Sequence, residues 1–419
     1  MSSIPHDAPF DSTLDLLADG YDFMAKRRQQ LHSDIFATRL LLQDVVCLVG
    51  AEAARLFYED ERVTRRGAMP ITTLTLLQDF GSVQMLDGAA HHCRKAMFMS
   101  LMSPDGIQRL VDIAADRWRE RIPVWAGRDR VTLLPALQGL YCRAVCDWAG
   151  IPLDDAEARQ RTREFAAMIE GAGSIGPRNW RGQLLRWRSE RWARAVIEQI
   201  RDGARAAPEG SAVQVFATHR DLDGRLLEPK IAAVELINLL RATTAVARFV
   251  TFEALALHDH PEWRGRLQGA DDDEIERFVQ EVRRFYPFFP FIGERVLVDL
   301  EWQGHHFAEG AWLALDLDGT DHDARLWDDP DSFRPERFLT WDRSLFNFVP
   351  QGGGNHDRSH RCPGEWITIA LMKDAARWLT AGMTYDTPPQ DLSVDRTHMP
   401  TKPHSGFVID HVREMNAAA

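Results

Sequence analysis

The sequence lacks the features that mark several common protein classes. Its 419 residues contain no run of about 18 apolar residues, so no transmembrane span is expected. The N-terminal stretch MSSIPHDAPFDSTLDLL is polar and acidic, which is not the pattern of a signal peptide. A net positive charge is lacking: 62 acidic residues outnumber 50 basic ones, and the formal net charge of −12 argues against general affinity for nucleic acid or anionic membranes.

Cysteine is also scarce, and its spacing matters. The five cysteines are an odd number and show no metal-finger spacing, which excludes a disulfide scaffold and a zinc finger. Cys142 and Cys146 lie one helical turn apart in an apolar segment, where small buried hydrophobic side chains are expected. A reducing, cytoplasmic location fits this usage.

What the sequence does contain is helical periodicity. Apolar positions recur at i, i+3, i+4 and i+7 through most of the first 300 residues. The longest such pattern covers about 227–258, with Pro229 suited to its first turn. Strand-like segments are fewer, near 294–302, 305–317 and the C-terminus. No repeat or linker divides the chain, so we expect one domain over 1–419, mainly α with a small β portion.

The sharpest local signal lies in FNFVPQGGGNHDRSHRCPGEWITIALM, residues 346–372. A glycine-rich stretch precedes Cys362, and an apolar helical pattern follows it. Glycines allow a backbone to approach a flat ligand closely. A helix N-terminus favours the thiolate form of a nearby cysteine.

This segment resembles the haem-binding cysteine loop of the cytochrome P450 superfamily. Three further motifs occur in the order of that superfamily. EVRR supplies Glu281 and Arg284, and FRPERF supplies Arg337, which the resemblance places together in a buried charge triad. LDGAAHHCRK resembles the helix whose basic residues, here His91 and Lys95, hold a haem propionate.

The longer loop PQGGG…HRCPGEW is similar to one branch, the bacterial fatty-acid peroxygenases that use hydrogen peroxide directly. That likeness covers essentially the whole chain and includes RRGAMP, which contributes Arg65. It implies haem b as the cofactor, Cys362 as the axial iron ligand, and Arg65, His91, Lys95 and His360 as further cofactor-binding residues. It also implies hydrogen peroxide as co-substrate and no obligatory reductase.

An arginine stands in the middle of the long helical pattern, in LLRATTAVARF. Most superfamily members carry an acid–alcohol pair there, which delivers protons to bound dioxygen; this chain has Arg241 and Ala242 instead. A guanidinium binds a carboxylate through paired charge-assisted hydrogen bonds. In the resembling peroxygenases the arginine anchors a fatty acid, whose carboxylate then acts as acid and base. The alternative is a solvated stripe formed by Asn238, Arg241 and Arg248, which share a helix face.

The resemblance points to further pocket residues. Gln84 matches a catalytic position above the haem, where glutamine favours hydroxylation and histidine favours decarboxylation. Phe288, Phe289 and Phe291 are expected to line an acyl channel. Ala242 replaces the usual proline, so the helix is expected to stay regular and the substrate position to differ.

Together these residues imply that the substrate is a small-molecule carboxylic acid, namely a fatty acid, which is hydroxylated at its α or β carbon. Three alternatives stay open: a reductase-dependent monooxygenase that uses Thr243 or Thr244; an enzyme for a different acid, with partial oxidative decarboxylation; and a haem-binding sensor without catalysis.

Overall fold

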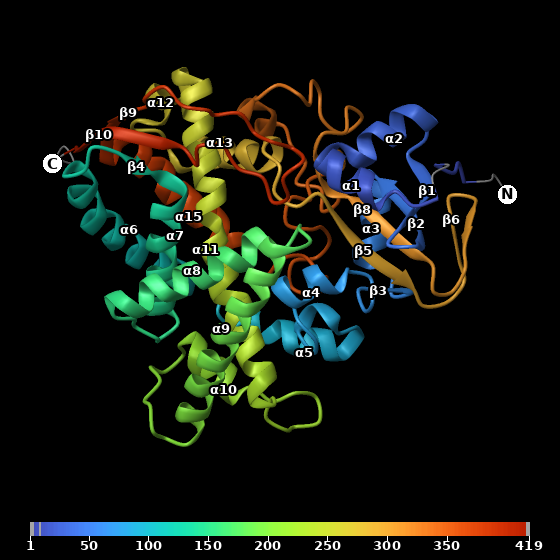
Figure 1. The fold of residues 1–419 in the computed structure, drawn as a ribbon, viewed down its shortest axis with the longest axis horizontal. Helices are drawn as coiled ribbons and strands as arrows, with labels where there is room; N and C mark the ends of the chain where they lie inside the picture. Colours follow the sequence, from blue (N-terminus) through green and yellow to red (C-terminus); the bar gives the residue numbers. More distant parts are fainter. Residues whose placement is uncertain (1–3, 8–9, 416–419) are drawn as a thin grey trace.

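The chain folds into a helical region and a smaller sheet region that lie side by side (Figure 1). The structure is a computed structural model and describes residues 4–7 and 10–415. The first described residues lie beside the sheet, whereas the last described residues lie at the far end of the helical region (Figure 1). No helix among the described residues combines the length and apolarity needed to cross a membrane.

Helix α11 (Pro229–Asp259) is the axis of the helical region and is buried along most of its length. Pro229 occupies its first turn, where a missing N–H has no cost. The helix ends just before Pro261, which begins the next one. The sequence prediction of a helix over about 227–258 is confirmed.

The other helices surround α11 or cover the sheet. They are α1 (Thr13–Asp19), α2 (Phe23–Leu31), α3 (Ala51–Glu59), α4 (Ile71–Leu77), α5 (Gly88–Met99), α6 (Pro104–Ala126), α7 (Leu133–Trp148), α8 (Asp155–Gly171), α9 (Pro177–Arg201), α10 (Ala212–Thr218), α12 (Pro261–Leu267), α13 (Asp272–Phe285), α14 (Leu317–Asp321) and α15 (Glu365–Arg377). Short helical turns occur at η1 (Gly20–Asp22), η2 (Val83–Met85), η3 (Pro335–Leu339) and η4 (Trp378–Gly382).

The main sheet has the strand order β1-β2-β8-β5-β3. Its strands are β1 (Ile35–Leu40), β2 (Gln43–Val49), β3 (Val63–Thr64), β5 (Phe291–Val296) and β8 (Trp312–Asp316). Only β2 and β8 run parallel, with Val46 opposite Leu313. Smaller sheets join β4 (Val131–Thr132), β10 (Val408–Glu414) and β9 (Met383–Asp386), and pair β6 (Leu300–Trp302) with β7 (His305–Phe307). The predicted strand segments 294–302 and 305–317 are therefore confirmed, each split in two.

The charge triad expected from the two motifs is present and buried. Arg284 donates from Nε and Nη2 to the two carboxylate oxygens of Glu281, each at 2.8 Å. The Nε of Arg337 lies 3.1 Å from Glu281 Oε2. The triad ties α13 to η3, and so positions the chain that leads into the cysteine loop.

Candidate haem-thiolate active site

One cavity of about 240 Å³ lies between α11, the cysteine loop, α4, α5 and the start of β5. Every site residue chosen from the sequence lines it: Arg65, Gln84, His91, Lys95, Arg241, Ala242, Phe288, Phe289, Phe291, His360 and Cys362. These residues span nearly 300 positions of sequence, so the fold has gathered them. The geometry thus places the candidate residues in one site.

Cys362 lies just before the N-terminus of α15. Its backbone N–H donates to the Gln351 carbonyl at 3.0 Å, and Gln351 Nε2 lies 3.8 Å from its Sγ. Burial, with the charge of Glu365, raises the pKa of the Cys362 thiol, whereas the backbone N–H of Gly364 lowers it. A metal cation at this point would reverse the balance, because a coordinating thiol is deprotonated outright.

The glycines of the loop also approach a neighbour within the protein, and Gly352 lines the cavity as well. Gly352 and Gly354 have φ of +95° and +77°, which few other residues adopt. A Cβ on either would come within 3.0 Å of Tyr58, on α3. The close approach that glycine allows is therefore to a tyrosine ring, which fixes the loop against the sheet region.

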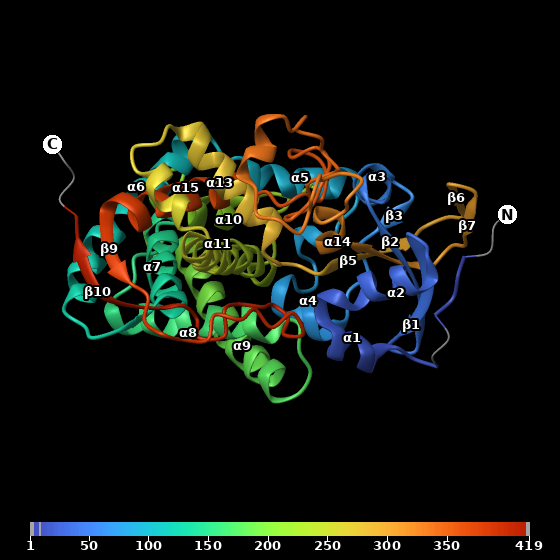
Figure 2. The ribbon, with the colours of Figure 1, turned by 90° about the horizontal axis from the view of Figure 1, so that it is seen from above.

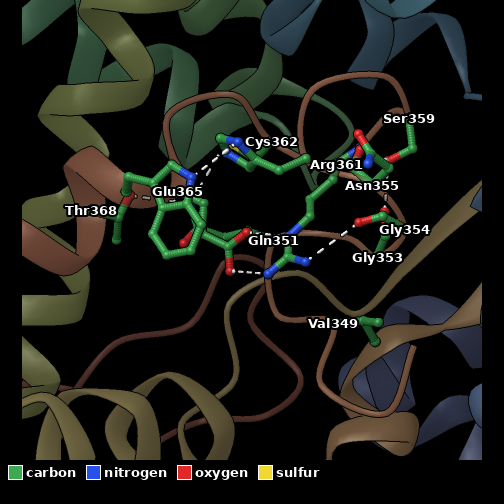
Figure 3. Close-up of polar contacts among 12 residues, drawn as sticks. Val349, Gln351, Gly353, Gly354, Asn355, Ser359, Arg361, Cys362, Glu365 and Thr368 are labelled. Atoms are coloured by element: carbon green, nitrogen blue, oxygen red, sulfur yellow. Dashed lines mark hydrogen bonds and ion pairs between the residues drawn. The ribbon is translucent and has the colours of Figure 1, made fainter. Parts of the chain in front are cut away.

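Paired charges hold the two ends of the loop together (Figure 3). Arg361 donates from Nε to Glu365 Oε2 at 2.5 Å and from Nη1 toward the Gly354 carbonyl at 3.4 Å. Arg283 on α13 donates to the other oxygen of Glu365. These contacts lower the pKa of Glu365 against its burial. The cysteine is therefore carried on a rigid frame.

A cluster of basic side chains forms the wall on the α5 side. The rings of His91 and His360 lie 4.0 Å apart between centroids. Burial and the neighbouring cation of Lys95 lower the pKa of His91 to about 3, and burial also lowers the pKa of Lys95 to about 8. Lys95 Nζ donates to the Arg361 carbonyl at 2.7 Å. Arg65 has buried Nε and Nη2 atoms without hydrogen-bond partners.

This cluster fits the propionate groups of haem. Buried cations with unused N–H donors are costly unless an anion meets them. The nearest acid, Glu294, approaches Arg65 at 3.5 Å, and burial raises the pKa of that carboxyl to about 8. The cations of Arg65 and Lys95 are therefore short of negative charge, the neutral rings of His91 and His360 lie beside them, and a thiol lies in the same cavity.

Arg241 is buried on α11 and faces this cavity. Its Nη2 donates to the Leu77 carbonyl at 2.7 Å, and its Nε has no partner. No Asp or Glu lies within ion-pair distance of it among the described residues. Burial lowers the pKa of Arg241 to about 9, and the cation of Arg186 adds to the effect. The side chain is oriented before any ligand arrives.

The solvated-stripe alternative is wrong. Asn238, Arg241 and Arg248 are all buried. Arg248 is paired with Glu170 at 2.5 Å, whereas Asn238 Nδ2 donates to the Gln78 carbonyl at 3.0 Å. Of the two arginines, only Arg241 is left without an acidic partner within the described part of the chain.

The remaining candidates lie in η2 and in the middle of α11. Gln84 lies in η2, and its Oε1 is buried without a partner. Ala242 lies within the uninterrupted α11, as expected where alanine replaces a helix-bending proline. Thr243 and Thr244 both donate to carbonyls one turn earlier, and of the two only Thr243 lines the cavity.

The three phenylalanines separate the cavity from a second, apolar one of about 160 Å³. Phe288, Phe289 and Phe291 line both. The ring of Phe288 stacks on Phe249 with centroids 4.2 Å apart, and the Tyr21 hydroxyl donates to its carbonyl at 2.7 Å. The second cavity continues past α4 to the loop between α8 and α9. The two cavities therefore meet at these rings.

Sequence reasoning missed the residues that position the site. The carbonyl of Leu77 and the cation of Arg186 act on Arg241 from α4 and α9. Tyr58 supports the cysteine loop from α3. None of these belongs to a motif, and a backbone carbonyl carries no signal of its own, so only the fold reveals them.

Comparisons with known proteins agree with this geometry. The family described as Cytochrome P450 matches residues 275–379. The putative cytochrome P450 120 of Synechocystis sp. is 25% identical over 391 residues, covering 86% of this chain and 85% of that protein.

Three solved structures are similar over nearly the whole chain. Cytochrome P450SP alpha (CYP152B1) in complex with (R)-ibuprofen is 47% identical, with a TM-score of 0.94, and the match covers 96% of this chain and 99% of that one. Cytochrome P450EX alpha (CYP152N1) with myristic acid is 40% identical, with a TM-score of 0.95 and coverage of 99% and 100%. Cytochrome P450 OleT in complex with arachidonic acid is 34% identical, with a TM-score of 0.96 and full coverage of both chains.

Proposed function

Since this chain belongs to the cytochrome P450 family, we propose that it is a peroxygenase that uses hydrogen peroxide to hydroxylate a fatty acid at the α or β carbon. Its haem b is held by Cys362, with Arg65, His91, Lys95 and His360 as partners for the propionates. The similar structures named above contain myristic acid, arachidonic acid or ibuprofen, each of which is a carboxylic acid.

The charge of the cavity wall supports this function. Four cationic side chains line the cavity, Arg65, Lys95, Arg241 and Arg361, and no Asp or Glu does among the described residues. Arg65, Lys95 and Arg361 lie on the side of the cavity formed by the cysteine loop and α5. Arg241 lies on α11. An anion separate from the cofactor is therefore required at Arg241, and a fatty-acid carboxylate supplies it.

Arg241 does two things in this mechanism. Its free N–H donors hold the carboxylate, and its tie to the Leu77 carbonyl fixes where that carboxylate lies. The carboxylate takes a proton from hydrogen peroxide and returns it to the departing oxygen, which leaves as water. No side chain of the protein needs to supply that proton, which suits a helix with Arg241 and Ala242 in place of an acid.

When bound, haem b supplies the redox chemistry that splits the O–O bond and inserts one oxygen atom into a C–H bond. Anchoring the carboxylate at Arg241 keeps the adjacent carbons in the same cavity as Cys362, and so selects the α and β positions. Phe288, Phe289 and Phe291 hold the acyl chain and exclude water. Gln84 stays neutral at any pH, so it cannot act as an acid, and hydroxylation dominates over decarboxylation.

The proposed reaction needs no reductase, because peroxide already carries the two electrons that a reductase would deliver. All five cysteines are free thiols, which fits a reducing cytoplasm.

The test is turnover by purified holoprotein given only hydrogen peroxide and a long-chain fatty acid, with products identified by mass spectrometry. We expect 2- or 3-hydroxy acids, and none from the methyl ester, which lacks the anionic group. Arg241→Ala should lower the rate by about 10²–10⁴-fold, because the acid–base group is no longer held.

The control is Arg163→Ala, an exposed arginine on α8, which should leave the rate unchanged. The cofactor content of each variant is checked by its absorption spectrum. Full activity of Arg241→Ala would contradict the anchor. Hydroxylation that needs a reductase and not peroxide would contradict the peroxygenase assignment.

A further inference from the structure

Helix α9 presents a face that no other described part of the chain covers. Trp180, Leu184 and Trp187 recur at the spacing of one helix face, and they are 69%, 54% and 53% exposed. Ile175, just before the helix, is 60% exposed. Exposed aromatic side chains grouped in this way mark an interaction surface rather than ordinary solvent exposure.

The polar residues of this face share one sign of charge. Helix α9 carries seven arginines and two glutamates, a net charge of +5, on a chain whose net charge is −12. Arg181, Arg188 and Arg191 are exposed, and none forms an ion pair within the described residues. Both glutamates are already paired with arginines of the same helix.

The opposite face of α9 fixes this surface next to the substrate route. Asn179 Nδ2 donates to the Thr72 carbonyl at 3.1 Å, and Gln183 Nε2 donates to Thr75 Oγ1 at 2.7 Å. Both partners belong to α4, which lines the active-site cavity. Ile175 lines the second cavity, which leads past Phe289 to that site. Figure 2 shows α9 and α4 together along one edge of the molecule.

We propose that the α9 face, formed by Ile175, Trp180, Leu184, Trp187, Arg181, Arg188 and Arg191, docks on an anionic lipid surface. Tryptophan and leucine enter the headgroup region, and the arginines pair with anionic headgroups. The mouth of the apolar cavity then opens beside the membrane surface. The proposal concerns binding, and it does not depend on the peroxygenase activity.

Charge selects a lipid surface over a second copy of the chain. A two-fold dimer through α9 would bring the same unpaired arginines of both copies together, and they would repel. An anionic bilayer complements them. The net charge of −12 opposes general membrane affinity, but at physiological salt it acts over only about 8 Å, so the local face decides docking.

The experiment is co-sedimentation of the holoprotein with vesicles, without peroxide. Vesicles rich in phosphatidylglycerol are compared with vesicles of phosphatidylcholine alone. We expect binding to the anionic vesicles only. Arg181→Gln, Arg188→Gln and Arg191→Gln together should weaken it about a hundredfold, since each basic residue near the surface contributes about fivefold.

The matched control changes three other exposed arginines, Arg109→Gln, Arg128→Gln and Arg130→Gln, which lie on α6 and the turn after it. This variant has the same net charge and should bind like the unmodified protein. A second variant, Trp180→Ser with Trp187→Ser, should lose binding while keeping its haem spectrum. The proposal is overturned if the unmodified protein binds neither vesicle, if the control weakens binding equally, or if the tryptophans instead hold a dimer in solution.

Discussion

Lys95 carries a charge that depends on what occupies the cavity. Burial lowers the pKa of its ammonium to about 8, and its Nζ donates to loop carbonyls on either side of His360. An anionic propionate beside it favours the protonated form and raises that pKa. Lys95 would therefore take up a proton on haem binding above pH 8.

The contribution of Lys95 to haem affinity, measured as the ratio between the unmodified protein and Lys95→Met, should consequently fall as the pH rises through about 8. The sign follows because the apoprotein has lost the proton that the complex keeps. Affinities are measured by haem titration between pH 6 and about 10. Lys95→Met should weaken haem binding about 10- to 150-fold below pH 8, the value of a hydrogen bond to a charged group, and this difference from the unmodified protein should shrink above pH 8.

Lys26→Met is the control, because Lys26 is exposed and paired with Asp19 away from the cavity. It should change neither the affinity nor its pH dependence. A Lys95→Met protein with unaltered haem affinity would show that Lys95 only supports the loop.

At the scale of elements, the join between α13 and η3 depends on one buried carboxylate. Glu281 faces both Arg284 and Arg337, and its own side chain has no exposure. Removing one partner from such a group leaves buried cations without compensation. The surrounding segment leads directly into the cysteine loop.

Glu281→Gln should therefore lower the free energy of unfolding by about 3–5 kcal/mol, measured by urea denaturation of the holoprotein. Glu336→Gln, in η3 next to Arg337, is the control. Glu336 pairs with Arg266 at the surface, so its loss should cost under about 1 kcal/mol. Equal effects of the two substitutions would mean that burial of the triad contributes nothing.

The sequence predicted the elements whose patterns are local. Helix α11 was visible because about 30 residues repeat their apolar positions and Pro229 opens the first turn. The hairpin of β1 and β2 was missed, since strands of six and seven residues inside a helical sequence carry a weak signal. The parallel pairing of β2 with β8, some 265 residues apart, is set by packing and not by either segment.

The site divides in the same way. Side chains within motifs, such as Cys362 and Arg241, were predicted because their chemistry depends on residue type. The residues that position these side chains were not predicted. Leu77 acts through its backbone carbonyl, and Arg186 acts through its charge on a side chain far away in the sequence. The contact of the loop glycines with Tyr58, far away in the sequence, was not predicted either.

At the scale of the whole molecule, the cavity lies between the sheet region and the helical region, and bound haem would hold part of its wall. Loop 350–364 and α5 supply most of the basic wall. Helices α7 and α8 pack instead into the large apolar core around α11. Removal of haem should therefore loosen the molecule unevenly.

Hydrogen exchange of the apoprotein and holoprotein tests this. We expect faster exchange in α5 and in loop 350–364 without haem, and unchanged protection in α7 and α8. The reason is that like charges lose their counterions only along the basic wall. Uniform loosening, or none, would mean that the cofactor does not hold the two regions together.

The absence of carboxylates from the described cavity wall has one more consequence. In the proposed reaction the base is the carboxylate of the substrate, so the enzyme is inactive until the substrate binds. Peroxide reaching the empty protein meets no carboxylate on the described cavity wall that could take its proton and return it, so the oxidant is not wasted. Met69, Met102 and the cysteine sulfur, which all border the cavity, are thereby spared from self-inflicted damage between turnovers.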